Sequence, residues 1–132
     1  MSKRILICKD REATRNEITL MLGRAGYHVF SVPTFSQAQE HLSGEKPFDA
    51  IILGGNLLPG TSGIHNGIPD ALEWICVKAS QANQEAPIIF YTGYPWAKGV
   101  ARTYEGLHFV QPNVGGLDEL KAKVMELTRI AA

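Results

Sequence analysis

The chain has 132 residues, which suits one domain and is short for two, so we treat residues 1–132 as a single domain. Hydrophobic residues make up 45% and charged residues 20%, which is typical of globular proteins and excludes disordered, collagen-like and coiled-coil chains. The 13 basic and 13 acidic residues leave a formal charge of +0, which argues against nucleic-acid and anionic-membrane binders because these need a basic excess.

The start of the chain and its cysteines indicate the cytoplasm. Only four apolar residues separate Arg4 from Lys9, too few for a secretory signal, and no apolar run approaches the roughly 18 residues of a membrane span. Cys8 and Cys76 form no cluster with other metal-ligating residue types. We therefore expect two buried or half-buried thiols in a reducing compartment, with no metal and no cofactor.

Short apolar runs alternate with helical stripes along the whole chain. In chain order the patterns predict a strand at 5–8, a helix at 12–25, a strand at 28–32, a helix at 35–42, a strand at 50–53, a helix from 69 to about 79, a strand at 87–91, a helix at 96–104, a strand at 108–110 and a helix from 117 to about 130. Gly26 marks the end of the first helix, and Thr34 with Gln37 fits a capping box for the second.

Five strand–helix units in succession predict an α/β fold, with a parallel sheet covered by helices on both faces. In such sheets the functional crevice lies beyond the carboxyl ends of the strands. The candidate segments are those that follow four of the strands, namely Lys9-Asp10, the glycine-rich loop from Gly54 to Gly67, Thr92-Gly93 and Gln111-Pro112.

Several of these pieces, in this order, resemble the receiver domain of bacterial two-component response regulators. The resemblance covers nearly the whole chain and rests on the segments 5–10, 25–27, 48–53, 58–60, 87–92 and 111–112. It implies a doubly wound five-stranded sheet in the flavodoxin-like order 2-1-3-4-5.

Receivers accept a phosphoryl group on an aspartate at the end of the third strand. The family pattern also has two acidic residues after the first strand, a hydroxyl after the fourth, and a lysine before proline after the fifth. The resemblance places Lys9 and Asp10 at the two acidic positions and Thr92 at the hydroxyl position. It places Gln111 at the lysine position, followed by Pro112 as in the family.

The acceptor position falls on one of two glycines. Counting forward from Asp49 places it at Gly54, and counting back from Pro59 places it at Gly55; neither residue has a carboxylate. His108 stands at the position of the family's switch aromatic, where a plain strand residue is the alternative interpretation.

These departures predict a degenerate receiver, a pseudo-receiver that is not an enzyme and acts in signal transduction as a phosphorylation-independent protein-interaction module. The expected partners are other signalling proteins or a second copy of the chain, without nucleic acid or membrane. Trp96 and Tyr104 are the predicted partner-facing aromatics. The alternative is a flavodoxin-like small-molecule or nucleotide binder that uses the loop from Gly54 to Gly67, and a bound flavin would colour such a protein.

Overall fold

The computed structural model describes residues 3–9, 11–54, 83–84, 86–91, 107–110 and 116–128. The strands and helices it describes are β1 (Arg4–Cys8), α1 (Glu12–Arg24), β2 (His28–Val32), α2 (Phe35–Leu42), β3 (Ala50–Leu53), β4 (Ile88–Tyr91), β5 (Leu107–Val110) and α5 (Gly116–Thr128). Each agrees with a predicted element to within one or two residues at the ends. The predicted helices at 69–79 and 96–104 lie outside the described residues.

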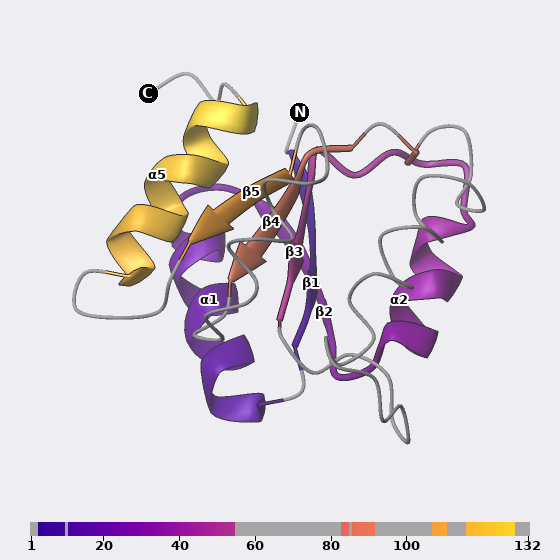
Figure 1. Ribbon diagram of the computed structural model, residues 1–132, viewed down its shortest axis with the longest axis horizontal. Coiled ribbons are helices and arrows are strands. Elements are labelled where there is room, and N and C mark those ends of the chain that lie inside the picture. Colours follow the sequence, from indigo (N-terminus) through magenta and orange to yellow (C-terminus); the bar gives the residue numbers. More distant parts are fainter. Residues whose placement is uncertain are drawn as a thin grey trace.

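The five strands form one parallel sheet in the order β2-β1-β3-β4-β5, as predicted. Figure 1 shows the strands side by side between two helical layers, with α1 and α5 against one face and α2 against the other. The fold class is therefore the flavodoxin-like α/β fold. Because every strand runs in the same direction, their carboxyl ends meet at one edge of the sheet.

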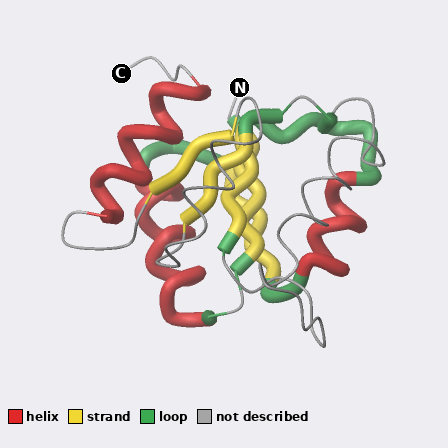
Figure 2. Tube along the Cα trace, viewed as in Figure 1, coloured by secondary structure: helices red, strands yellow, loops and turns green. Residues whose placement is uncertain are grey.

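The core has two layers, one on each face of the sheet, because side chains alternate along a strand. Figure 2 shows the helices that close these layers. In one layer, Ile5 and Ile7 of β1 pack with Ile18 and Leu22 of α1 and with Leu120 and Val124 of α5. The layer on the other side joins strand residues to α2 and contains Leu6, Cys8, Phe35, Ala38, Leu42, Phe48, Ile51, Leu53 and Phe90. Cys8 is a buried cysteine, as expected.

Local signals in the sequence explain where α1 ends and α2 begins. Gly26 follows α1 with a φ of 99°, a left-handed conformation that glycine adopts without penalty, and its amide donates to the Gly23 carbonyl. The Thr34 hydroxyl accepts a hydrogen bond from the Gln37 amide, as the capping box predicts. The Gln37 side chain differs from the prediction, since its Oε1 accepts from the Thr34 hydroxyl rather than serving a backbone amide.

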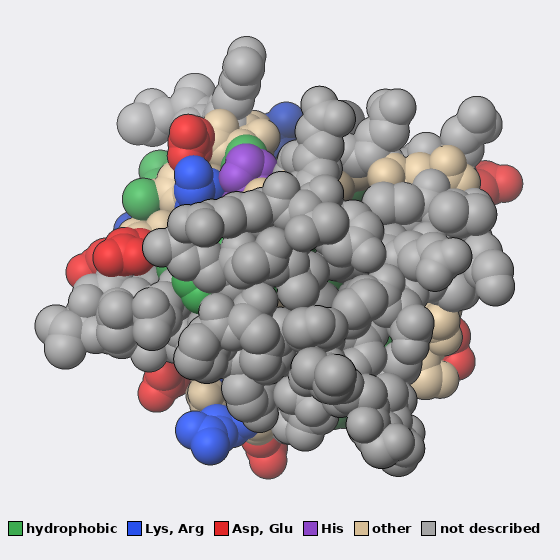
Figure 3. All heavy atoms as spheres, in the orientation of Figure 1, with side chains coloured by type: hydrophobic (Ala, Val, Ile, Leu, Met, Phe, Trp, Pro, Cys, Tyr) green, Lys and Arg blue, Asp and Glu red, His purple; other side chains and the backbone are tan. Residues whose placement is uncertain are grey.

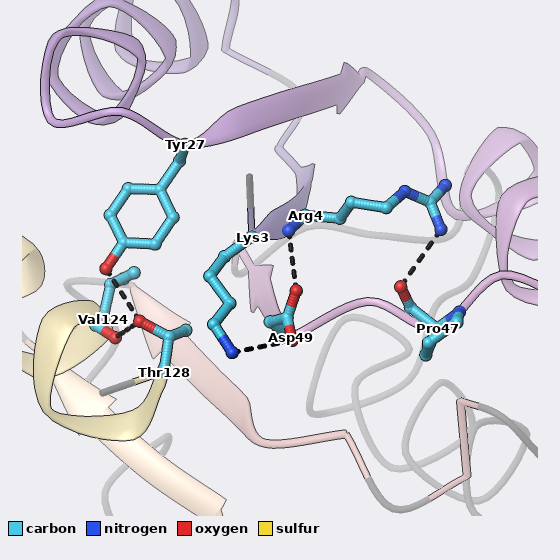
Figure 4. A network of polar contacts seen from close by, with 7 residues as sticks. All are labelled: Lys3, Arg4, Tyr27, Pro47, Asp49, Val124 and Thr128. Atoms are coloured by element: carbon cyan, nitrogen blue, oxygen red, sulfur yellow. Dashed lines mark hydrogen bonds and ion pairs between the residues drawn. The ribbon is translucent and has the colours of Figure 1, made fainter. Parts of the chain in front are cut away.

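Polar contacts tie the amino ends of the strands together (Figure 4). The Asp49 carboxylate accepts from the Arg4 amide at 2.7 Å and lies 4.0 Å from the Lys3 ammonium, while the Arg4 guanidinium donates to the Pro47 carbonyl. These contacts hold the segment that leads into β3 against the start of β1. They therefore support the register that brings the carboxyl ends of the two strands level.

A second contact in Figure 4 fastens α5 to the rest of the domain. The Tyr27 hydroxyl and the Thr128 hydroxyl lie 2.7 Å apart in a buried hydrogen bond, and Thr128 also donates to the Val124 carbonyl. A buried hydroxyl without a partner would destabilise the fold, so this pair satisfies both groups at once. It joins the start of β2 to the last turn of a helix 101 residues further along the chain.

The charged surface agrees with the balanced composition. On the face shown in Figure 3, the described acidic and basic side chains are interspersed at the margin over α1 and α5, and they form no patch of one sign there. No helix within the described residues is long and apolar enough to cross a membrane.

Candidate functional site

Three residues lie level with one another at the carboxyl edge of the sheet. Cys8 of β1 pairs with Leu53 of β3, and Leu53 pairs with Phe90 of β4. The next residue along each strand is therefore Lys9, Gly54 or Tyr91. The Gly54 amide donates to the Cys8 carbonyl at 2.8 Å, which keeps the first residue after β3 in the pairing.

The Lys9 side chain lies over Gly54. A Cβ atom at position 54 would stand 3.0 Å from Lys9 Cγ, 3.3 Å from Lys9 Nζ and 3.4 Å from Lys9 Cα. Lys9 Nζ also lies 5.9 Å from the centre of the Tyr91 ring, within the range of a cation–π contact. The lysine therefore spans from the end of β1 across β3 to the end of β4.

The backbone of Lys9 is held from two sides. Its amide donates to the Val32 carbonyl of β2 at 3.1 Å, and its carbonyl accepts from Arg15 Nη1 of α1 at 2.8 Å. Such bonds to a charged donor are stronger than those between neutral groups. The start of the lysine side chain is thus fixed relative to β2 and α1, which favours its path over the neighbouring strand.

Tyr91 is the residue of this row that the sequence analysis did not single out. It is buried at the end of β4, and burial raises the pKa of its phenol, with a smaller contribution from the negative charge of Glu17. Its phenol therefore stays neutral at physiological pH and offers Lys9 an uncharged ring. The signal in the sequence was its place as the last residue of a buried strand.

His108 lies in the middle of β5, level with Ile89 of β4 and half-buried. On the neighbouring helix α5, Lys123 and Glu126 form an ion pair of 3.0 Å. Burial lowers the pKa of His108, the positive charge of Lys123 lowers it further, and Glu126 acts in the opposite direction. The folded domain therefore favours the neutral imidazole.

Acidification should destabilise the domain through His108. Its pKa in the folded chain lies below the ordinary value of 6.5, so the unfolded chain binds the proton more tightly. The contribution of His108 is complete above that ordinary value and is lost as the pH falls from it toward the lower folded pKa. Urea denaturation at several pH values across this window should show a steeper loss for the wild type than for His108→Gln. Parallel curves would contradict this assignment.

The structure brings together two of the residues predicted for the crevice, Lys9 and Gly54. The other residues predicted for the crevice lie outside the described part of the chain; they are Asp10, Gly55 and the rest of the loop to Gly67, Thr92, Gln111 and Pro112. The predicted partner-facing aromatics, Trp96 and Tyr104, also lie outside it. Their roles therefore stay predictions. Gly54 directly follows β3, and the choice between Gly54 and Gly55 as the acceptor position stays a prediction.

The described residues of the crevice do not suit a divalent metal ion. Mg²⁺ takes oxygen ligands, mostly carboxylates, whereas here an ammonium lies beside a glycine. Among the described residues, no group of three or more His, Cys, Asp or Glu side chains lies close enough to hold a metal.

Comparison with solved structures finds receiver domains of response regulators. One is the response regulator TrrA from Thermotoga maritima, solved with Mg²⁺ and BeF, at 26% identity and a TM-score of 0.69 over 95% of this chain and 98% of that one. A CheY-like receiver domain from Methanospirillum hungatei has 22% identity and a TM-score of 0.70 over 98% of both chains. The receiver domain of the hybrid histidine kinase CckA has 23% identity and a TM-score of 0.69, over 95% of this chain and 98% of that one.

These likenesses show the fold, which is that of CheY-like receiver domains. No family model matches the chain, and no curated protein sequence matches it. The predicted resemblance is thus supported at the level of architecture, and the receiver fold suggests a place in signal transduction.

Proposed function

We propose that the chain is a degenerate receiver domain that works as a phosphorylation-independent protein-interaction module in signal transduction. The observation that supports it most directly is the Lys9 side chain lying over Gly54 at the carboxyl edge of a receiver-type sheet. In receivers this edge carries the carboxylates that hold the metal and accept the phosphoryl group. Here a cation and a glycine stand at that edge.

Charge explains why this crevice is unsuited to phosphoryl transfer. A dication about 4 Å from one carboxylate gains about 2 kcal/mol at the dielectric of bulk water, and a lysine at equal distance cancels that gain. One carboxylate at Asp10 is therefore offset by the ammonium of Lys9. Enzymatic phosphoryl transfer depends on positioning and on stabilising charge. The glycines at positions 54 and 55 supply no acceptor carboxylate, and the lysine at position 9 supplies no metal ligand.

The proposed module would signal through contacts with other proteins. We infer other signalling proteins as partners, because receiver domains interact with such proteins, and a second copy of the chain remains an alternative partner. Trp96 and Tyr104 stay the predicted anchors, together with the start of α5, where Asp118 and Glu119 are exposed.

Treatment with acetyl phosphate tests the chemistry. The intact protein should show no mass increase corresponding to a phosphoryl group, because the two candidate acceptor positions, 54 and 55, are glycines without a carboxylate. A receiver that phosphorylates itself from acetyl phosphate serves as the positive control under the same conditions. A phosphoryl group mapped by peptide mass spectrometry to any residue of the crevice would contradict the proposal.

A further inference from the structure

We propose that Lys9 is an internal occupant of the crevice, a side chain of the protein itself that fills the space over Gly54 and keeps the ends of β1, β3 and β4 in one arrangement. The proposal concerns the conformation of the domain rather than its phosphorylation. Its consequence for signalling rests on the proposed function. A crevice that Lys9 already fills would present the same surface to partner proteins whatever the level of phosphorylation in the cell.

Steric fit is the first support for this role. A side chain at position 54 would place its Cβ 3.0 Å from Lys9 Cγ, which is closer than carbon atoms normally approach. Lys9 Cγ can move away only by rotation about the Cα–Cβ bond, which would also carry the ammonium away from its present place. The arrangement of Lys9 over position 54 therefore fits glycine there and would have to give way to a larger residue.

Backbone conformation gives no other reason for a glycine here. Among the described glycines, Gly26 has a positive φ and Gly54 does not, so any residue could adopt the backbone of Gly54. Gly23 of α1 provides a contrast, since a Cβ there would meet no atom within 4 Å. Among the described residues, the constraint at position 54 is thus the neighbouring lysine.

The reach of the side chain is the second support. Lys9 Nζ lies 3.3 Å from the place of a Cβ on Gly54 and 5.9 Å from the centre of the buried Tyr91 ring. The lysine backbone is bonded to β2 and to Arg15 of α1. One residue therefore connects three strand ends, and its removal would leave space between them.

A double-mutant cycle between positions 9 and 54 tests the proposal. In the wild type, Gly54→Ala should lower the folding equilibrium constant about fivefold or more, because the added methyl group overpacks against Lys9. In the Lys9→Ala background the same change should cost little or be slightly favourable, since Cγ is gone and alanine narrows the unfolded ensemble. In the Lys9→Met background the loss should return, because methionine restores Cγ. Gly23→Ala should have the same effect in every background.

Equal losses from Gly54→Ala in all three backgrounds would overturn the proposal. Single variants give a second readout if the alanine variant does not fold. Lys9→Ala should shift the backbone amide resonances of Gly54, directly after β3, and of Tyr91, at the end of β4. An exposed change such as Arg24→Ala should leave them unchanged. Unmoved resonances in Lys9→Ala would also overturn it. All of these measurements report folding and packing, so they can fail while the acetyl phosphate result stands, and the reverse also holds.

Discussion

Replacing Asn83 with alanine is expected to lower the free energy of unfolding by about 2–4 kcal/mol, because it leaves buried backbone groups without partners. The Asn83 side chain is fully buried. Its Oδ1 accepts from the Phe48 amide at 2.8 Å, and its Nδ2 donates to the carbonyls of Leu42 and Lys46 at 3.3 and 3.4 Å. One side chain thus satisfies the end of α2 and the segment that leads into β3.

Two further variants separate this effect from a general cost of substitution. Asn16→Ala changes an exposed asparagine of α1 and should be neutral or slightly stabilising, because alanine is the better helix former. Asn83→Asp keeps the acceptor for the Phe48 amide but turns a carboxyl group toward two carbonyl oxygens, so it should be more harmful at neutral pH than at acid pH. Urea denaturation measures all three. A loss below about 0.5 kcal/mol for Asn83→Ala would mean that other contacts hold the segment between α2 and β3 in place.

The strands could be predicted from the sequence because most of them are covered on both faces. All four residues of β3 are fully buried, so its sequence is an uninterrupted run of apolar residues. The sequence of β1 shows the same pattern from Ile5 onward. Helix ends were also readable where a single residue determines the backbone, as at Gly26 and Thr34. Local chemistry was sufficient for these features.

Contacts between distant segments could not be predicted in this way. Asn83 lies 35 residues from Phe48, and Tyr27 lies 101 residues from Thr128, so no local pattern connects them. For the crevice, local patterns indicated only that Lys9 and Gly54 each follow a strand. The resemblance to receivers supplied the strand order that places β1 beside β3, and the structure adds that the lysine side chain lies over the glycine.

The placement of Lys9 changes what a repair of the crevice requires. An aspartate introduced at position 54 would meet Lys9 Cγ and would have the ammonium beside its carboxylate. The two opposite charges would pair, and the lysine would keep a divalent cation away. Metal binding should therefore return only when the lysine is removed and the carboxylate is added in the same variant. Comparing the single with the combined variant tests the charge argument directly.

Gly54→Asp alone should not produce measurable Mg²⁺ binding, whereas Gly54→Asp combined with Lys9→Asp and Gln111→Lys should produce it. The combined variant gains two carboxylates, loses the Lys9 cation and gains the cation of Gln111→Lys. Each carboxylate contributes about 2 kcal/mol toward a dication even at the dielectric of water and a lysine opposes it by as much, so a net gain of about 2 kcal/mol over the single variant remains. Its affinity should therefore exceed that of the single variant by more than tenfold, as measured by Mg²⁺ titration followed by amide chemical shifts. Replacing the new Asp at position 54 by Asn in the same background keeps the shape and should remove most of the gain. A parallel series at Gly55 covers the second count of the acceptor position. If Gly54→Asp alone binds Mg²⁺ or takes up a phosphoryl group from acetyl phosphate, then Lys9 does not exclude the metal and the charge argument fails.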